Sequence, residues 1–281
     1  MLTFDTIQSV KEFLSGKKRE GKTTGFVPTM GALHEGHLEL MRRAKKENDL
    51  LVVSVFVNPI QFNNPEDLEK YPRDLEKDKQ LLESVGCDVL FAPGVSEMYP
   101  EKEVTEKFDF GKLEQVMEGA FRPGHFNGVA VVVKRLFNII EPNKAYFGEK
   151  DFQQLAIIQK LTEMEKIPVT VVPCPIVRET DGLAMSSRNQ RLTPEERKIA
   201  PFIYQTLKQA VELKNSMSPN EVKQWVIERF SDKPQFTPEY FEIADDQLLQ
   251  PVSNWKDAEG VVGFIAVFLG KVRLIDNIRF Y

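Results

Sequence analysis

The sequence predicts an α/β fold, with a Rossmann-like doubly wound parallel sheet followed by a smaller α+β domain. Apolar runs of strand length alternate with helix-patterned segments through the first 175 residues. Residues 50–57, LLVVSVFV, are apolar almost throughout, which suits a strand that is covered on both faces. The alternation stops near residue 177, so we expect one domain over residues 1–176 and a second over residues 177–281.

The elements of the first domain follow from the spacing of its apolar residues. A βαβαβ unit is expected over residues 25–28, 36–48, 50–58, 75–85 and 89–92. Apolar residues between Val129 and Ile140 then recur at helical spacing and stop before Pro142. A strand, a helix and a strand complete this domain, over residues 145–147, 152–161 and 169–172.

The second domain has a different order of expected helices and strands. A polar turn at residues 179–182 precedes two helical stretches, around residues 194–215 and 219–230. Three later strands are expected over residues 240–243, 261–268 and 272–275. Helices followed by sequential strands are typical of an α+β arrangement.

Composition narrows the class of protein. With 42% hydrophobic and 28% charged residues, the chain is expected to be globular. A net charge of -5 argues against a broad cationic face for nucleic acid, although it allows a small positive pocket for a phosphorylated ligand. The most apolar run, residues 261–269, is about half the length that crosses a bilayer, so no membrane role is expected. Cys87 and Cys174 are expected to be buried, reduced thiols, and the first ten residues do not resemble a signal peptide, which favours the cytoplasm.

Two of the three histidines stand in the stretch FVPTMGALHEGH, residues 26–37. His34 and His37 are three positions apart at the expected start of a helix, so their imidazoles share one helical face. Gly36 leaves the backbone accessible, and a helix N-terminus attracts anions, so a polyphosphate could bind here. One alternative is a pair of partly buried histidines with ordinary hydrogen bonds. A zinc site would need a third ligand, and His125 is the one histidine left to supply it.

Five blocks in one order give the chain a closer resemblance. They are FVPTMGALHEGH at 26–37, VSVFVNPIQF at 53–62, RPGHFNGV at 122–129, FGEKDFQQL at 147–155 and CPIVRETDGLAMSSRN at 174–189. Together they resemble the pantothenate synthetases, or pantoate:β-alanine ligases, of the HxGH nucleotidyltransferase superfamily. The resemblance implies a cytoplasmic homodimer that condenses (R)-pantoate with β-alanine. ATP and Mg²⁺ would be used, pyrophosphate and AMP released, and a pantoyl adenylate formed as the enzyme-bound intermediate.

The resemblance also implies roles for individual residues. The first domain would bind ATP and pantoate, and the second would close over the active site. The implied catalytic residues are His37, His34, Lys150 and Arg188. The implied ATP-binding residues are Met30, Gly31, Ala32, Leu33, His34, Glu35, Gly36, His37, Gly148, Glu149, Lys150, Asp151, Val177, Met185, Ser186, Ser187 and Arg188. The implied contacts to pantoate and β-alanine are Gln61, Gln154, Asn58, Arg122 and His125. Asp151 is a weak candidate to ligate magnesium, and the ATP phosphates would supply the other ligands.

Some segments have plainer interpretations. Without the resemblance, Asn58-Pro59 would be interpreted as a local turn and residues 185–188 as a polar linker. Residues 66–79 are expected to form a solvated helix face, with Tyr71 and Arg73 the best candidates for exceptions. Residues 63–65 and 117–121 differ from the form common in the family, which affects loop shape rather than reaction class. The rival functions are another HxGH adenylyl- or cytidylyltransferase and a non-catalytic ATP-binding module.

Overall fold

The computed structural model describes residues 1–63, 65–69, 71–101 and 106–281. The chain divides into two compact units. The first unit consists of residues 1–110, 122–149 and 154–175. The second unit consists of residues 111–121, 150–153 and 176–281, so it includes two short stretches that come before its main segment in the sequence.

The first unit contains a six-stranded sheet whose strands pair in parallel, in the order β1-β4-β3-β2-β5-β6. Its strands are β1 (Leu2–Phe4), β2 (Thr24–Thr29), β3 (Leu50–Val55), β4 (Val89–Phe91), β5 (Lys144–Gly148) and β6 (Thr170–Cys174). The predicted doubly wound parallel sheet is confirmed. The strand order reverses between β2 and β5, and ligands of such sheets bind beyond the carboxyl ends of the strands at that reversal.

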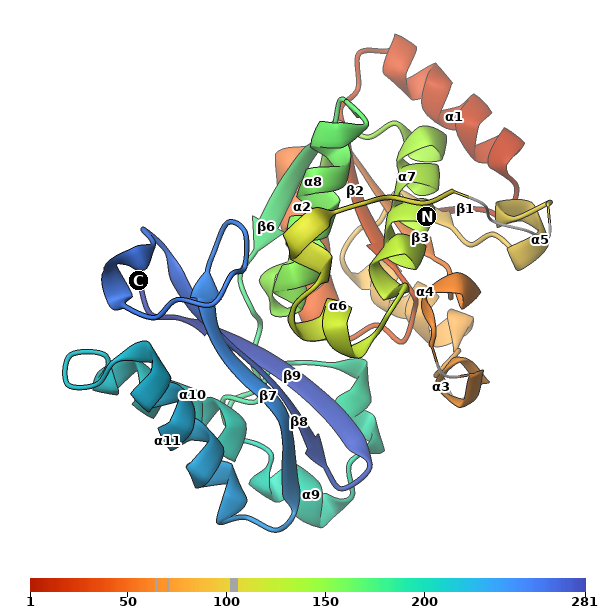
Figure 1. The fold of residues 1–281 in the computed structure, drawn as a ribbon. Coiled ribbons are helices and arrows are strands. Elements are labelled where there is room, and N and C mark those ends of the chain that lie inside the picture. The colour runs from red at the N-terminus through yellow and green to blue at the C-terminus, as the bar shows by residue number, and fades with distance from the viewer. Residues whose placement is uncertain (64, 70, 102–105) are drawn as a thin grey trace. The chain divides into compact units, whose positions relative to one another are not determined.

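Helices cover both faces of this sheet. The helices of this unit are α1 (Ile7–Arg19), α2 (Glu35–Glu47), α3 (Pro65–Glu69), α4 (Leu75–Ser84), α5 (Val95–Met98), α7 (His125–Ile140) and α8 (Phe152–Met164). On one face, Met41 of α2 and Leu82 of α4 share an apolar cluster with Val27 of β2. Neighbouring strand residues face opposite ways, so Phe26 lies on the other face, where its ring is 6.4 Å from that of Phe137 of α7. Figure 1 shows α7 beside α1.

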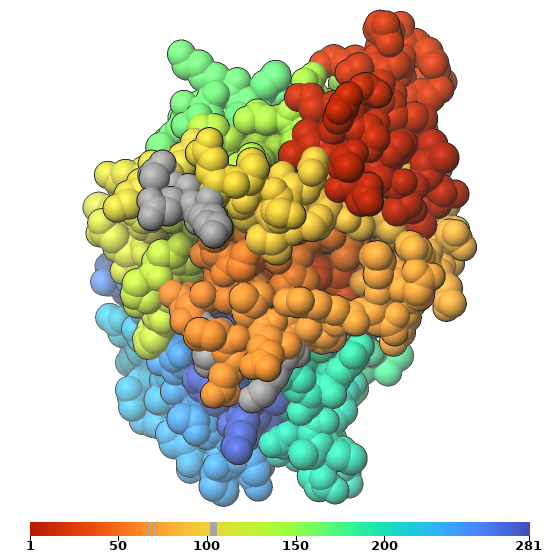
Figure 2. Space-filling model, turned by 90° about the vertical axis from the view of Figure 1, so that its right-hand side faces the viewer, coloured from red at the N-terminus to blue at the C-terminus, as the bar shows by residue number. Residues whose placement is uncertain are grey.

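β1 and α1 were not predicted from the sequence. β1 has three largely exposed residues and pairs with β4, far along the chain, so its apolar pattern is weak. α1 buries only Val10 and Leu14 among charged neighbours. The Ile7 N–H donates to the Glu97 carboxylate at 2.7 Å, and Figure 2 shows the N-terminal segment (red) against residues near 95 on one face of the molecule.

The second unit is built on a three-stranded antiparallel sheet in the order β7-β8-β9. Its strands are β7 (Phe236–Asp245), β8 (Val261–Leu269) and β9 (Val272–Arg279), and its helices are α6 (Met117–Phe121), α9 (Pro194–Ile199), α10 (Phe202–Leu213) and α11 (Pro219–Ser231). Leu207 of α10 and Phe230 of α11 join an apolar cluster with Ile265 of β8. The helical stretch expected near residues 194–215 is two helices, with Pro201, which has no N–H to donate, before the second.

Partly buried ion pairs bind residues 111–121 to this sheet. Arg273 of β9 donates to the Glu118 carboxylate at 2.6 Å and also pairs with Glu239 of β7. The Tyr240 hydroxyl donates to Glu118 at 2.9 Å. From residues 150–153, the Gln153 amide donates to the carbonyls of Leu113 and Val116. These contacts explain why both short stretches belong to the second unit.

Cys87 and Cys174 are free and buried, as predicted, and burial raises the pKa of Cys87 to about 12. Within the described part of the chain, no helix combines the length and the apolar character needed to span a bilayer.

Candidate active site

The two histidines predicted to bind phosphate lie side by side at the start of α2. His34 occupies the N-cap position with an extended backbone, and its carbonyl accepts the His37 N–H at 2.8 Å. The ring centroids of His34 and His37 are 4.0 Å apart, at an interplanar angle of 35°. Two potential cationic donors therefore share the end of the helix where its own N–H groups favour anions.

The loop that leads from β2 to these histidines has an unusual backbone. Gly31 and Ala32 both adopt positive φ, at 81° and 51°. A Cβ on Gly31 would lie 2.8 Å from an oxygen of Asp78 and 3.1 Å from Val55. Only glycine fits there without a shift of its neighbours, because the loop is packed against α4 and β3.

Asp78 holds this loop from α4. Its side chain is 2% exposed, and its two oxygens accept the N–H groups of Ala32 at 3.1 Å and Leu33 at 2.8 Å. Burial raises the pKa of Asp78, although the two backbone donors act in the opposite direction. The expectation of a solvated helix face over residues 66–79 is wrong for Asp78. Lys70 and the side chain of Asp67 lie outside the described residues.

A buried polar network joins the ends of β2 and β3 to α7. Asn58 donates to the Gln61 side-chain oxygen at 3.0 Å and to the Gly128 carbonyl at 3.1 Å. The Tyr99 hydroxyl donates to Asn58 at 2.8 Å, and burial raises the pKa of that hydroxyl. Asn58 and Gln61 are 1% and 9% exposed, so these amides are fixed in place rather than free in a surface turn.

Gln61 links this network to two more predicted site residues. Its amide nitrogen lies 3.1 Å from the sulfur of Met30, in the loop before the histidines. The backbone carbonyl oxygen of Gln61 lies 2.9 Å from Nδ1 of His125, which is 6% exposed. Arg122 and Gln154 are also in the first unit, and both are partly exposed. The first unit therefore brings Asn58, Gln61 and His125 together with Met30, in the loop that leads to the histidine pair.

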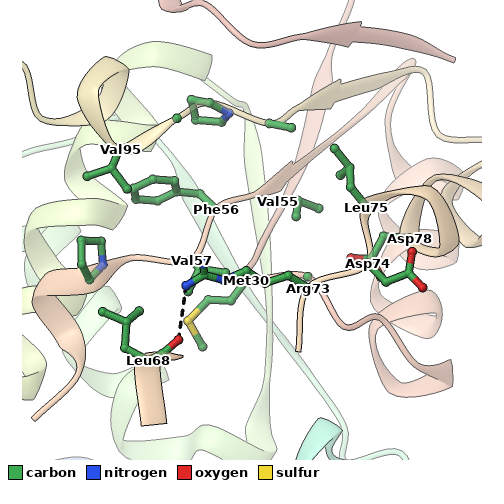
Figure 3. Close-up of a pocket in the computed structure, with 15 residues that line it drawn as sticks. Met30, Val55, Phe56, Val57, Leu68, Arg73, Asp74, Leu75, Asp78 and Val95 are labelled. Carbon is green, nitrogen blue, oxygen red and sulfur yellow. Dashed lines mark hydrogen bonds between the residues drawn. The ribbon is translucent and has the colours of Figure 1, made fainter. Parts of the chain in front are cut away.

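A cavity of about 330 Å³ lies beside the same loop. Figure 3 shows its mainly apolar lining, which includes Met30, Phe56 and Leu75, with Arg73 and Asp78 at the wall. Arg73, one of the two candidate exceptions in residues 66–79, donates to the Leu68 carbonyl at 3.2 Å. Tyr71, the other, packs its ring 5.8 Å from Phe62.

The predicted phosphate-binding residues after β5 divide between the units. Gly148 and Glu149 belong to the first unit, whereas Lys150 and Asp151 belong to the second. Lys150 Nζ lies 3.2 Å from the Asp151 carboxylate, and the side chain of Lys150 is 16% exposed. Nothing lies within 4 Å of the position that a Cβ on Gly148 would take, so the backbone is open to a ligand there.

The second unit also carries residues 185–188. The Met185 N–H donates to the Val177 carbonyl at 3.0 Å, which fixes the start of this loop. Ser186 accepts the Arg188 N–H at 3.2 Å, and Ser187 begins a short 3₁₀ helix. Met185, Ser186, Ser187 and Arg188 are all partly exposed, so a ligand can reach their side chains.

Among the described residues, no group of three or more histidine, cysteine, aspartate or glutamate side chains could hold a metal ion. The zinc alternative therefore gains no support from the geometry around His34 and His37. Asp78 and Tyr99 are the residues near the site that sequence analysis missed. Asp78 stood in a charged run and Tyr99 before a proline, and neither pattern indicates which acceptor or donor the fold supplies.

Comparisons with known proteins agree on one family. The family model for pantoate-beta-alanine ligase matches residues 2–279. A pantothenate synthetase of Porphyromonas gingivalis is 52% identical over 280 residues, covering 100% of this chain and 99% of the relative, and one of Bacteroides thetaiotaomicron is 51% identical with the same coverage.

Solved structures give the same result. The pantothenate synthetase of Thermus thermophilus is 46% identical, with a TM-score of 0.93 and 100% coverage of both chains. A pantoate-beta-alanine ligase of Francisella tularensis, complexed with beta-gamma ATP and beta-alanine, is 37% identical with a TM-score of 0.84, covering 100% of this chain and 98% of that one. Because these matches span the whole described fold, the chain belongs to the pantoate-beta-alanine ligase family of enzymes.

Proposed function

We propose that the chain condenses (R)-pantoate with β-alanine in two steps, through an enzyme-bound pantoyl adenylate. Ligase activity and ATP binding follow from family membership. The observation that carries the proposal for this site is the histidine pair, with ring centroids 4.0 Å apart at the N-terminus of α2. In the first step, a carboxylate oxygen of pantoate attacks the α-phosphorus of ATP and pyrophosphate leaves. In the second, the amine of β-alanine attacks the acyl carbon, and AMP leaves.

The first step concentrates negative charge, since the carboxylate and the triphosphate must be held together while the bond to pyrophosphate breaks. Donors that are already in place lower that barrier more than donors that must reorganise. His37 is proposed to meet the developing charge at the α-phosphate, and His34 a neighbouring phosphate. Lys150 and Arg188 are proposed to bring cations to the β- and γ-phosphates from the second unit. Residues 30–37, 148–151, 177 and 185–188 would then enclose ATP.

Pantoate and β-alanine are proposed to bind through the buried polar network of the first unit. The fixed amides of Asn58 and Gln61 suit a substrate that carries hydroxyls and a carboxylate, because an amide both donates and accepts. Gln61 is oriented by Asn58 and Met30, which supports a positioning role in addition to binding. Gln154, Arg122 and His125 are proposed to complete the substrate contacts. Fixed geometry of this kind converts a bimolecular attack into one that is effectively unimolecular.

Magnesium fits this site as a companion of the triphosphate. The Asp151 carboxylate is 47% exposed and could contribute one oxygen, while the phosphate oxygens supply others. When bound, the ion would neutralise phosphate charge. Water must be kept from the mixed anhydride, so substrates are proposed to bring the second unit and residues 179–190 over the reaction. A cytoplasmic homodimer is also proposed, on the resemblance alone.

The decisive experiment supplies ATP, pantoate and Mg²⁺ without β-alanine. One equivalent of pyrophosphate per active site and a tightly held acyl adenylate are expected, and β-alanine should then release AMP and pantothenate. Pyrophosphate release that yields a stable nucleotide-linked product would instead indicate a nucleotidyltransferase. Nucleotide binding with no pyrophosphate release would indicate a binding module. Either result would overturn the proposal.

A further inference from the structure

Two adjacent polar residues interrupt the apolar pattern of β9. Asp276 and Asn277 are 4% and 6% exposed. β9 pairs with β8 on one side and forms an edge of the three-stranded sheet, so its other side can bind segments from elsewhere in the unit. Buried polar side chains are costly unless they are hydrogen-bonded, and both of these residues make long-range bonds. They therefore serve as attachment points on the sheet.

Asp276 holds the base of the hairpin that precedes residues 185–188. Its two oxygens accept hydrogen bonds from the two terminal N–H groups of Arg178, at 2.7 and 2.9 Å. The same guanidinium donates to the Gly182 carbonyl at 3.1 Å and stacks 3.7 Å over the Tyr204 ring. A bidentate pair fixes both the distance and the plane of an arginine. Asp276 thus fixes the hairpin over residues 178–184, which continues directly into the loop at 185–188.

Asn277 holds the other phosphate-binding segment. Its side-chain amide donates to the Lys150 carbonyl at 3.1 Å, across 127 residues of sequence. The next residues along are also bound to the same sheet, since the Phe152 ring packs 5.4 Å from that of Phe264. The backbone that carries Lys150 is therefore fixed to β9 and β8.

From these contacts we infer that Asp276 and Asn277 are positioning residues for adenylate formation. One dipeptide is bonded to the segment of Lys150 and, through Arg178, to the hairpin before Arg188. It sets the spacing between the two proposed phosphate cations within the second unit. Displacements of about 1 Å in catalytic groups cost up to about a hundredfold in rate, so this spacing matters for chemistry as well as for folding. The inference rests on the proposed roles of Lys150 and Arg188.

The test measures the two half-reactions separately in Asn277→Ala and Asp276→Asn. Asn277→Ala removes the hydrogen bond to the Lys150 carbonyl and keeps the charge balance, whereas Asp276→Asn removes the negative charge that pairs with Arg178. We expect the pyrophosphate burst to slow about tenfold in Asn277→Ala and about thirtyfold in Asp276→Asn. KM for ATP should rise while KM for pantoate stays within twofold. Release of pantothenate from supplied pantoyl adenylate and β-alanine should change by less than about twofold.

Glu239→Gln is the matched control, because it weakens a partly buried ion pair with Arg273 in the same sheet, and Glu239 contacts neither segment. It should lower the thermal unfolding midpoint and leave the burst rate of the folded enzyme unchanged. If Asp276→Asn does not fold, Asn277→Ala decides the question. A burst within twofold of wild type in folded Asn277→Ala, or equal slowing of both half-reactions, would overturn the inference. A wild-type enzyme without any burst would instead refute the proposed function.

Discussion

Asp78 accepts the backbone N–H of Leu33 at 2.8 Å across 45 residues of sequence, and so ties α4 to the loop that presents the histidine pair. The same carboxylate accepts the N–H of Ala32, whose backbone is left-handed. A left-handed conformation at a residue with a side chain costs free energy, which these two hydrogen bonds offset. The position of His34 thus depends on a residue that the reaction itself does not use.

Replacement of Asp78 by asparagine is expected to slow the pyrophosphate burst by about tenfold and to lower the free energy of unfolding by about 1–3 kcal/mol. An amide offers one acceptor where the carboxylate offers two, and its NH₂ group would face a backbone N–H. Stopped-flow pyrophosphate detection and urea unfolding measure the two effects.

Asp74→Asn is the control for this change. Asp74 caps α4 from an exposed position by accepting the Lys77 N–H, and asparagine caps a helix about as well. Both quantities should therefore stay near wild type in Asp74→Asn. An Asp78→Asn enzyme with an unaltered burst would show that the loop keeps its shape without the carboxylate.

Sequence patterns predicted those elements whose own residues are apolar enough to indicate burial. β3 is apolar on both faces, so its role in the sheet could be inferred locally, and the same holds for the stripe of α7. β1 could not, because its pairing with β4 depends on a distant partner. Asp78 was not predicted for a related reason. Whether one carboxylate in a charged run is buried depends on the loop against which α4 packs. The attachment of Lys150 to β9 is likewise a tertiary contact without a local signature.

His37→Ala is expected to slow adenylate formation by at least about a hundredfold, in line with the loss of one transition-state donor. His37 follows the N-cap of α2, and its replacement leaves the apolar face of that helix intact, so the unfolding midpoint should change little. His37→Asn keeps a hydrogen-bond donor and should recover part of the rate. A normal pyrophosphate burst in His37→Ala would remove this residue from the mechanism.

The stability of the first unit should depend on pH through Glu47, at the end of α2. Its carboxylate accepts hydrogen bonds from Arg43, Lys144 and Tyr146, which lower its pKa to about 2. Because the pKa is lowered by folding, the stabilisation is complete above the ordinary value of 4.5 and is lost as the pH falls toward 2.

Glu47→Gln should therefore lower the free energy of unfolding by about 1 kcal/mol at pH 7, a value reduced for the partial exposure of the side chain. The difference between the variant and wild type should shrink steadily below about pH 4.5. Urea unfolding at pH 7, 5 and 3 measures it. A difference that stays constant across this range would mean that the shape of the amide, and not the lost charge, accounts for the effect.

Binding of ATP and pantoate is expected to order residues 179–190, which lead into and include the proposed phosphate loop. Arg178 already holds the base of this segment, whereas the side chains of residues 185–188 are partly exposed and make few bonds to the rest of the second unit. A triphosphate bound by Ser186, Ser187 and Arg188 would shield the backbone amides of these residues from solvent. Hydrogen exchange should then slow at least about tenfold in this segment, measured by mass spectrometry with and without both substrates.

The amides of β8, which are paired on both sides, provide the internal reference and should not change. Equal exchange in residues 179–190 with and without substrates would show that this loop does not respond to the triphosphate.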